Sequence, residues 1–195
     1  DLIQLDDKKL KSAFRTSSRD SQWILSFGEN LLKTKFIFDN LIIRNSLETT
    51  NRRKEGEWFL QKAYREDKNE KARGHLYVQT RFDKNSFLSK NQEILMLQSM
   101  FAVTFTTYKD TKWLYMALEY LFENVEKLNE DNFGNEFYVF LESLSKTFAK
   151  ERICNSSGID AQKLRYDYYV PVYAFNLTDY VLWKNREELC LVFKT

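Results

Sequence analysis

The stretch that decides the fold is QEILMLQSMFAVTFTTY, residues 92–108. Its large apolar side chains point in almost every direction around a 3.6-residue helical turn, as the spacing of Ile94, Leu97 and Phe101 shows. A helix that is apolar around most of its circumference is typical of the centre of a domain and not of its surface. We therefore expect a buried central helix here, with Met100 and Phe101 in the core.

Three further segments are expected to be helices from their apolar residues. One follows Asp110, a suitable N-cap, and a second follows Asn132, with NSSG at residues 155–158 as its stop signal. Another covers residues 172–183, after Pro171. The first two, together with the central helix, make three consecutive helices joined by short loops, which predicts a bundle. The stripes of these two consist of Trp113, Met116, Ala117, Tyr120, Leu121, Val125 and Leu128, then Phe137, Phe140, Leu141, Leu144 and Phe148, and the acids expected to face outward are Glu119, Glu123 and Glu126.

The N-terminal half of the chain has weaker signals. Residues 1–17 favour a helix, and from Gln22 onward apolar residues recur at near-helical steps, which predicts a long amphipathic helix. Residues 44–71 are the most polar part, and we expect a short helix between exposed loops there. The tetrapeptide HLYV at residues 75–78 favours a short strand or an extended connection. The residues that mark the long helix are Ile24, Phe27, Leu31, Phe38 and Ile42.

Composition agrees with a mainly α fold, which we expect to be a helical bundle with a short terminal β-strand. The 195 residues include only five Gly and one Pro, the residues that most often form tight turns and end helices. Hydrophobic residues make up 43% and charged residues 30%, as in ordinary globular domains. The length fits one domain, which we place at residues 1–188.

The last apolar run of the sequence is LCLVF at residues 189–193, which predicts a strand buried on both faces. Little else in the sequence predicts a partner strand for it. The chain also begins without Met. We therefore expect both ends to be cuts in a longer polypeptide, with proteolytic processing as an alternative for the first, and we treat residues 189–195 as an orphan strand.

The sequence offers no complete catalytic site. His75 is the single histidine, and no Cys lies near it to complete a metal site. The five Gly residues are scattered, so they form no phosphate-binding loop, and no serine lies in a Gly-x-Ser-x-Gly elbow. We expect no catalytic, cofactor-binding or metal-binding residue in this chain.

Charge and cysteine content limit which partners and which cell compartment we expect for this chain. The net charge is +2, from 30 basic and 28 acidic residues, so no strong overall field attracts the chain to a polyanion. Its two Cys lack metal-ligand spacing and favour a reducing compartment. The sequence has no apolar run of membrane-spanning length and no signal-peptide pattern. These features favour a cytoplasmic protein with no membrane partner.

One basic group is a candidate for DNA contact. It consists of Arg52, Arg53 and Lys54, with Trp58 shortly after it. Cationic side chains bind phosphates, and a Trp ring can stack on a base. Acids are interleaved nearby, however, and a solubilising surface is the favoured interpretation.

Four segments resemble the central region of the GmrSD-type restriction endonucleases. They are FDNLII (38–43), NQEILMLQSMF (91–101), WLYMALEYL (113–121) and, above all, FNLTDYVLWK (175–184). The likeness covers most of the chain from about residue 36 onward, and it lies in a helical pattern and not in a catalytic motif.

The resemblance implies a parent protein with a ParB/Srx-like nucleotide-hydrolysing domain, a helical middle and a C-terminal His-Asn-His nuclease, which restricts phage DNA that carries glucosylated bases or phosphorothioate linkages. In relatives, a strand and a Ser-Val-Glu-His motif follow the segment that matches residues 175–184, whereas this chain stops at Thr195. An Asp-Gly-Gln-Gln-Arg type motif is also missing. No catalytic residue is therefore carried over.

The sequence thus predicts an interdomain module, itself non-catalytic, that couples the two activities of a DNA endonuclease with nucleotide-hydrolysing activity. The parent would use a nucleoside triphosphate and a divalent metal, and the partners would be the flanking domains and, through the parent, modified DNA. Two alternatives stay open. One is a stand-alone helical protein-interaction adaptor, and the other is a small nucleic-acid-binding domain that uses Arg52, Arg53, Lys54 and Trp58.

Overall fold

A computed structural model describes residues 20–45, 55–65, 78–82, 87–107, 111–165 and 170–189. These residues are mainly helical, which confirms the predicted fold class. The α-helices are α2 (Ser21–Leu41), α3 (Asn91–Thr104), α4 (Lys112–Glu123), α5 (Phe133–Ile153) and α6 (Val172–Lys184), with two 3₁₀ turns, η1 (Leu88–Lys90) and η3 (Val125–Asn129).

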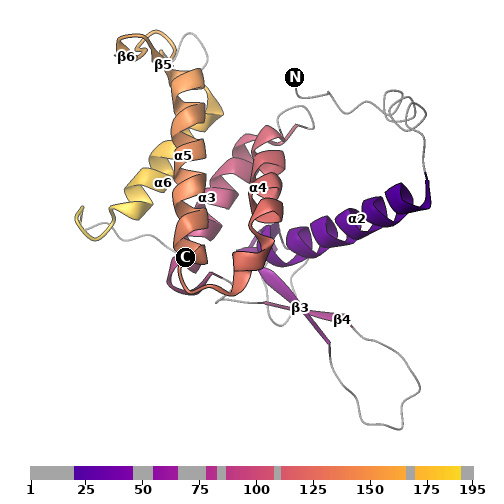
Figure 1. Cartoon of the computed structure of the whole chain (residues 1–195). Helices are drawn as coiled ribbons and strands as arrows, with labels where there is room; N and C mark the ends of the chain where they lie inside the picture. Colours follow the sequence, from indigo (N-terminus) through magenta and orange to yellow (C-terminus); the bar gives the residue numbers. More distant parts are fainter. Residues whose placement is uncertain are drawn as a thin grey trace.

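Helices α3, α4, α5 and α6 pack together and are called the body of the molecule here (Figure 1). Helix α3 lies against both α5 and α6, while α4 packs on α5. Helix α2 contacts α4 and β3, then runs away from the body toward its N-terminal end (Figure 1). The molecule therefore has a packed part and a projecting part.

Helix α3 is the centre of the core, as predicted. Met100 is 4% exposed and Phe101 is fully buried. The ring of Phe101 lies against those of Phe105, Trp113 and Phe148, at centroid distances of 6.2, 5.5 and 5.9 Å. Aromatic pairs at such distances add to the stabilisation from burial. These rings therefore join α3 to α4 and α5 in one core.

The stripes predicted for α4 and α5 are also confirmed, because Trp113, Leu121 and Phe137 are buried. The acids Glu119, Glu123 and Glu126 are exposed, as expected. The predicted N-cap of α4 at Asp110 lies outside the described residues, and Thr111 directly precedes the helix. Asn132 does precede α5, but its side chain bonds to the carboxylate of Glu136 and not to a backbone N–H. The stop signal is confirmed because α5 ends at Ile153, before a turn whose Gly158 has a φ of 120°.

Buried Gln98 of α3 ties the C-terminal end of α2 to the body. Its amide nitrogen donates a hydrogen bond to the carbonyl of Leu41 at 3.0 Å, and its amide oxygen accepts one from the N–H of Ile43 at 3.1 Å. These two backbone groups lie just where α2 ends, so they have no partner within the helix. Lys33 adds a contact on the outside, with its ammonium 3.9 Å from the centroid of the Phe122 ring on α4.

The N-terminal part of α2 is more exposed. The sequence correctly predicts the helix, but of its marker residues only Ile42 is buried and Phe38 is partly buried. Ile24, Phe27 and Leu31 keep 58%, 40% and 58% of their surface exposed. The apolar side of this helix is therefore largely uncovered in this structure.

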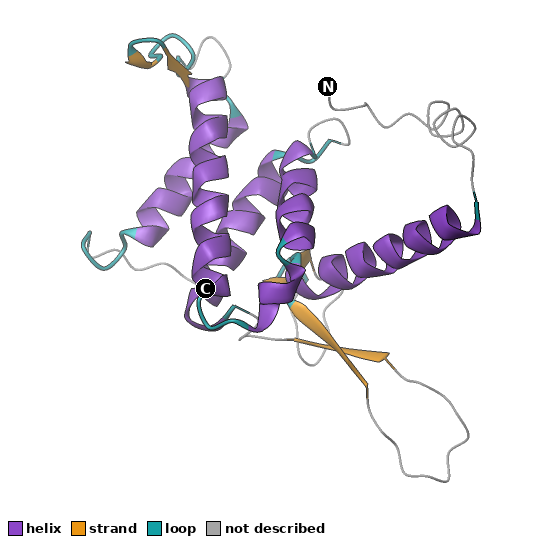
Figure 2. Cartoon of the chain, viewed as in Figure 1, coloured by secondary structure: helices purple, strands orange, loops and turns teal. Residues whose placement is uncertain are grey.

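Short antiparallel strands occupy the region between α2 and α3, and Figure 2 colours them orange. Strand β1 (Arg44–Asn45) pairs with β2 (Trp58–Phe59), and β3 (Gln61–Arg65) pairs with β4 (Val78–Phe82). A third pair, β5 (Cys154–Asn155) with β6 (Gly158–Ile159), follows α5.

The expectation of a short helix within residues 44–71 is therefore wrong for the described residues, 44–45 and 55–65. Its aromatic residues Trp58 and Phe59 form a strand instead, and Phe59 is buried while its backbone pairs with Arg44. Aromatic residues fit a pleated, half-buried surface well, and strand pairing there outweighs the helical tendency of the surrounding polar residues. The expectation of an extended segment near residues 75–78 is met at Val78, where β4 begins.

Some expectations fall on residues that the structure does not describe. The predicted N-terminal helix at residues 1–17 and most of the predicted terminal strand, residues 190–195, are of this kind. Leu189, the first residue of that strand, lies in a turn and its N–H donates to the carbonyl of Asn185. The orphan strand and the boundary at residue 188 stay predictions.

Candidate functional site

A shallow groove lies between α5 and α6 on the outer surface of the body. It has a volume of about 330 Å³, and its floor and walls are mostly apolar. Ala149, Leu177 and Val181 supply much of this apolar surface. The polar part consists of Glu142, Ser145, Lys146, Tyr180, Lys184 and Asn185.

One end of the groove holds a hydrogen-bonded network centred on Glu142. The Oε1 atom of this residue accepts hydrogen bonds from the hydroxyl of Tyr138 at 2.7 Å and from that of Tyr180 at 3.3 Å. The ammonium of Lys184 forms an ion pair with the same oxygen. The network brings together residues that are 42 positions apart in the sequence, so it fixes α6 against α5.

The network changes the acidity of its members. Burial pushes the pKa of Glu142 upward, but the hydrogen bonds from Lys184, Tyr138 and Tyr180 and the charge of Lys184 outweigh burial, so the pKa lies below its ordinary value. The hydrogen bond to Glu142 is the main cause that raises the pKa of Lys184. Burial, together with the neighbouring Tyr138 and Glu142, strongly raises the pKa of Tyr180. The pair is therefore charged, and Tyr180 is neutral, near pH 7.

Helix α6 is fixed to the body by residues of the segment FNLTDYVLWK and by Tyr173 just before it. The hydroxyl of buried Tyr173 donates to the carbonyl of Ser145 at 2.6 Å. The amide of Asn176 donates to Thr104 of α3 at 2.9 Å. The segment that carries the resemblance therefore has a structural use, in packing α6 against both α3 and α5.

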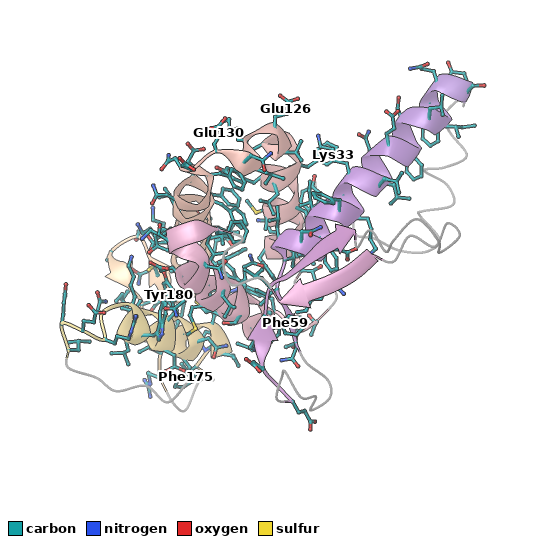
Figure 3. The ribbon with its side chains drawn as sticks, turned by 90° about the horizontal axis from the view of Figure 1, so that it is seen from below. Lys33, Phe59, Glu126, Glu130, Phe175 and Tyr180 are labelled. Atoms are coloured by element: carbon teal, nitrogen blue, oxygen red, sulfur yellow. The ribbon has the colours of Figure 1, made fainter. Side chains whose placement is uncertain are left out.

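Three other apolar residues of α6 are exposed. Val172, Phe175 and Val181 keep 47%, 58% and 44% of their surface exposed. Figure 3 shows Phe175 at the outer edge of α6, with Tyr180 nearer to α5. The α5–α6 groove, which Val181 lines, is one candidate surface for a protein partner, since exposed apolar side chains mark such sites.

A second candidate surface is the projecting part of α2. Ile24, Leu25, Leu31, Leu32 and Phe36 keep between 53% and 72% of their surface exposed within one helix. No other described helix exposes as many large apolar residues. Figures 1 and 3, which view the molecule at right angles, both show this part of α2 standing away from the body.

The predicted DNA-contact group is only partly described. Arg52, Arg53 and Lys54 lie outside the described residues, as does His75. Trp58 lies on β2, partly buried and packed against the core. Its ring therefore serves packing, the more common use of Trp, and its grouping with the three basic residues stays a prediction.

Sequence reasoning missed both surfaces. The α5–α6 groove depends on contacts between Glu142 and Lys184, which no local pattern reveals. The α2 surface does have a signal, since Ile24, Leu25, Leu31 and Leu32 recur at helical spacing, but the pattern does not tell whether the same chain covers them.

Metal sites, membrane spans and relatives add no identification. In the described part of the chain, no three His, Cys, Asp or Glu side chains come together in a way that could hold a metal ion. None of the described helices has the length and apolar character needed to cross a bilayer. No family model, curated protein or solved structure matches this chain.

Proposed function

We propose that this chain is a helical module that couples two other domains of a modification-dependent restriction endonuclease. In this proposal, a nucleotide-hydrolysing domain and a His-Asn-His nuclease of the parent protein communicate through the body of helices α3–α6. The parent acts in the cytoplasm on modified phage DNA. Its nucleoside triphosphate and divalent metal are bound by the flanking domains, and the module itself performs no chemistry.

The observation that supports the proposal most is that α6 both packs against the body and lines the groove. On one side Tyr173, Tyr180 and Trp183 are buried against the body. Val181 of the same helix stays exposed and lines the α5–α6 groove. A domain that docks on α6 therefore contacts an element that is rigidly joined to α3 and α5. Close-packed interiors transmit displacement, so such a contact can pass a change in position to the far side of the body.

The shape and chemistry of the groove favour a protein partner. The groove is open, and apolar Ala149, Leu177 and Val181 line it, which suits the apolar face of a helix in a neighbouring domain. A site for a small metabolite would enclose most of its ligand. The ion pair of Lys184 with Glu142 at one end supplies charges that fix the orientation of the docked element.

Phage restriction by the whole reading frame that contains this chain tests the proposal. We expect cells that express it to resist a phage with modified bases and to remain sensitive to the same phage with unmodified bases. Substitution Val181→Glu in the parent places an uncompensated charge in the groove. We expect it to lower restriction at least about 10-fold, while nucleotide hydrolysis by the parent persists, because the docking contact and not the chemistry is lost.

The matched control is Ile159→Glu on β6, where the native residue keeps 71% of its surface exposed. This variant should restrict phage as the wild type does. A reading frame that encodes no nuclease or nucleotide-hydrolysing domain contradicts the proposal and favours the stand-alone adaptor. Equal restriction by Val181→Glu and Ile159→Glu contradicts the role of the groove.

A further inference from the structure

The exposed apolar residues of α2 are arranged symmetrically about Gly28. Leu25 and Leu31 lie three positions before and after it, and Ile24 and Leu32 lie four positions before and after it. Residues at these offsets share one side of a helix with the central position. All four are large and aliphatic, and each keeps at least 58% of its surface exposed.

Among the described residues, none lies close enough to Gly28 to require a glycine there. A Cβ atom placed on it would meet nothing within 4 Å. Glycine is the weakest helix former apart from proline, so the helix is not stabilised by it either. The lack of a side chain does, however, let a second backbone approach closely at this point. Gly28 lies at the centre of the four aliphatic residues, where two crossing helices come nearest.

We infer that a second copy of this chain covers this surface, with the two α2 helices antiparallel and crossing at Gly28 on a twofold axis. In a twofold interface, if one residue contacts another, the reverse contact is made as well. Antiparallel crossing at Gly28 then places Leu25 opposite Leu31 of the second copy and Ile24 opposite its Leu32. The symmetric spacing therefore makes the surface complementary to itself.

Charge favours the antiparallel arrangement over the parallel one. Lys35, paired with Asp39, lies on the same side of α2 as Gly28. A parallel pair places the two Lys35 ammonium groups next to each other, whereas an antiparallel pair separates them by 14 residues, roughly 21 Å along a helix. The helix dipoles are also opposed in the antiparallel pair, which is the favourable arrangement.

The area and the shape suit such a dimer. Ile24, Leu25, Leu31, Leu32 and Phe36 together expose roughly 600 Å², close to the ~800 Å² that each partner buries in a stable interface of standard size. Lys33, which contacts α4, lies on the opposite side of α2 from Gly28, so the body does not block the paired face. The dimer therefore leaves both α5–α6 grooves open, and it is independent of the function proposed above.

Sedimentation equilibrium of the 195-residue chain tests this inference. We expect a dimer that dissociates in the micromolar range. Leu25→Glu and Leu31→Lys should each weaken dimerisation at least about 100-fold, because each places an unpaired charge in the apolar interface. Ile159→Glu on β6 is the matched control and should dimerise as the wild type does. Unchanged circular dichroism of each variant shows that the fold is retained.

Mixing the variants distinguishes the two orientations. A mixture of Leu25→Glu with Leu31→Lys should recover a heterodimer, because the antiparallel pair brings the new carboxylate and ammonium together. A mixture of Leu25→Glu with Leu25→Lys should stay monomeric. Recovery by the second mixture alone overturns the antiparallel arrangement. A wild-type chain that is monomeric at about 100 μM, or a dimer that tolerates Leu25→Glu, overturns the inference altogether.

Discussion

The body and the projecting part of α2 use similar apolar residues for different purposes. In the body, Phe101 is fully buried among the rings of Phe105, Trp113 and Phe148. In α2, Leu32 keeps 72% of its surface exposed. Both residues belong to regular α-helices, so the difference comes from what packs on each helix. The body is stabilised by its own core, whereas the projecting part of α2 leaves several large apolar side chains exposed.

Truncation of one apolar side chain in each part gives the largest expected contrast. Phe101→Ala should lower the free energy of unfolding by about 3–5 kcal/mol, since it leaves a cavity between three rings. Leu32→Ala should change it by less than about 0.5 kcal/mol in dilute solution, as is usual for surface positions. Urea unfolding at low protein concentration measures both. Equal losses would mean that α2 packs as tightly as the body.

The contact between α2 and the body should be the next most sensitive to substitution. Gln98→Leu keeps the size of the side chain but leaves the carbonyl of Leu41 and the N–H of Ile43 without their partner. The loss of stability should be about 2–4 kcal/mol, because both groups lie in buried surroundings. Gln92→Leu, at an exposed position of the same helix, is the matched control and should be nearly neutral. A small effect of Gln98→Leu would show that other contacts hold α2 in place.

Replacing a glycine by alanine should change the stability of the fold in opposite directions in the two parts. A Cβ atom added to Gly134 of α5 would clash with the backbone carbonyl oxygen of Phe87 and would lie 3.1 Å from its carbonyl carbon. Gly134→Ala should therefore destabilise the fold by about 1–3 kcal/mol. Gly28→Ala should stabilise the helix by about 0.5–1 kcal/mol in dilute solution, because the space is open and alanine is the better helix former. Thermal unfolding gives both values, and a loss of stability for Gly28→Ala would contradict the open surface.

The Glu142 network should contribute a smaller and pH-dependent amount. The lowered pKa of Glu142 means that its ionised form stabilises the fold above its ordinary pKa, and that this stabilisation is lost as the pH falls through the lowered pKa. The raised pKa of Lys184 means that its contribution is present at neutral pH and is lost as the pH rises through the raised pKa. The network therefore acts fully near pH 7.

Glu142→Gln should cost about 1–2 kcal/mol at pH 7, a value kept small by the partial exposure of Lys184. The difference from the wild type should shrink as the pH falls through the lowered pKa of Glu142 and its carboxylate gains a proton. Glu136→Gln on the same helix is the control, since its carboxylate accepts only from Asn132 at the surface. A cost that does not change between pH 7 and pH 3 would contradict the charged state of the network.

The helices could be predicted from the sequence because each carries its own periodic signal. Phe101 lies within an apolar run that only a buried helix explains, and Phe137 belongs to a stripe that follows a turn. The strands could not be predicted in the same way. Trp58 and Phe59 lie among polar residues, and their strand depends on pairing with Arg44 and Asn45, more than ten residues earlier.

The candidate surfaces were less predictable than the fold. The pattern of Ile24, Leu31 and Leu32 correctly indicates an apolar helix face, yet such a pattern does not reveal whether the chain or a partner covers it. The Glu142–Lys184 pair joins residues on two helices, and neither residue differs locally from a solvated surface charge. Physical contact across the fold, and not local sequence, creates both surfaces.

Native-state hydrogen exchange compares the two parts directly. In dilute solution, the amides of residues 25–32 should exchange at least about 100-fold faster than those of residues 97–101, because the side chains of Leu25, Leu31 and Leu32 are largely exposed and the second segment opens only when the core unfolds. Protection of residues 25–32 should rise with protein concentration as the second copy covers them, while protection of residues 97–101 should rise far less. Equal protection of the two segments in dilute solution, with no dependence on concentration, would show that α2 is stabilised by its own chain and would contradict its role as a docking surface.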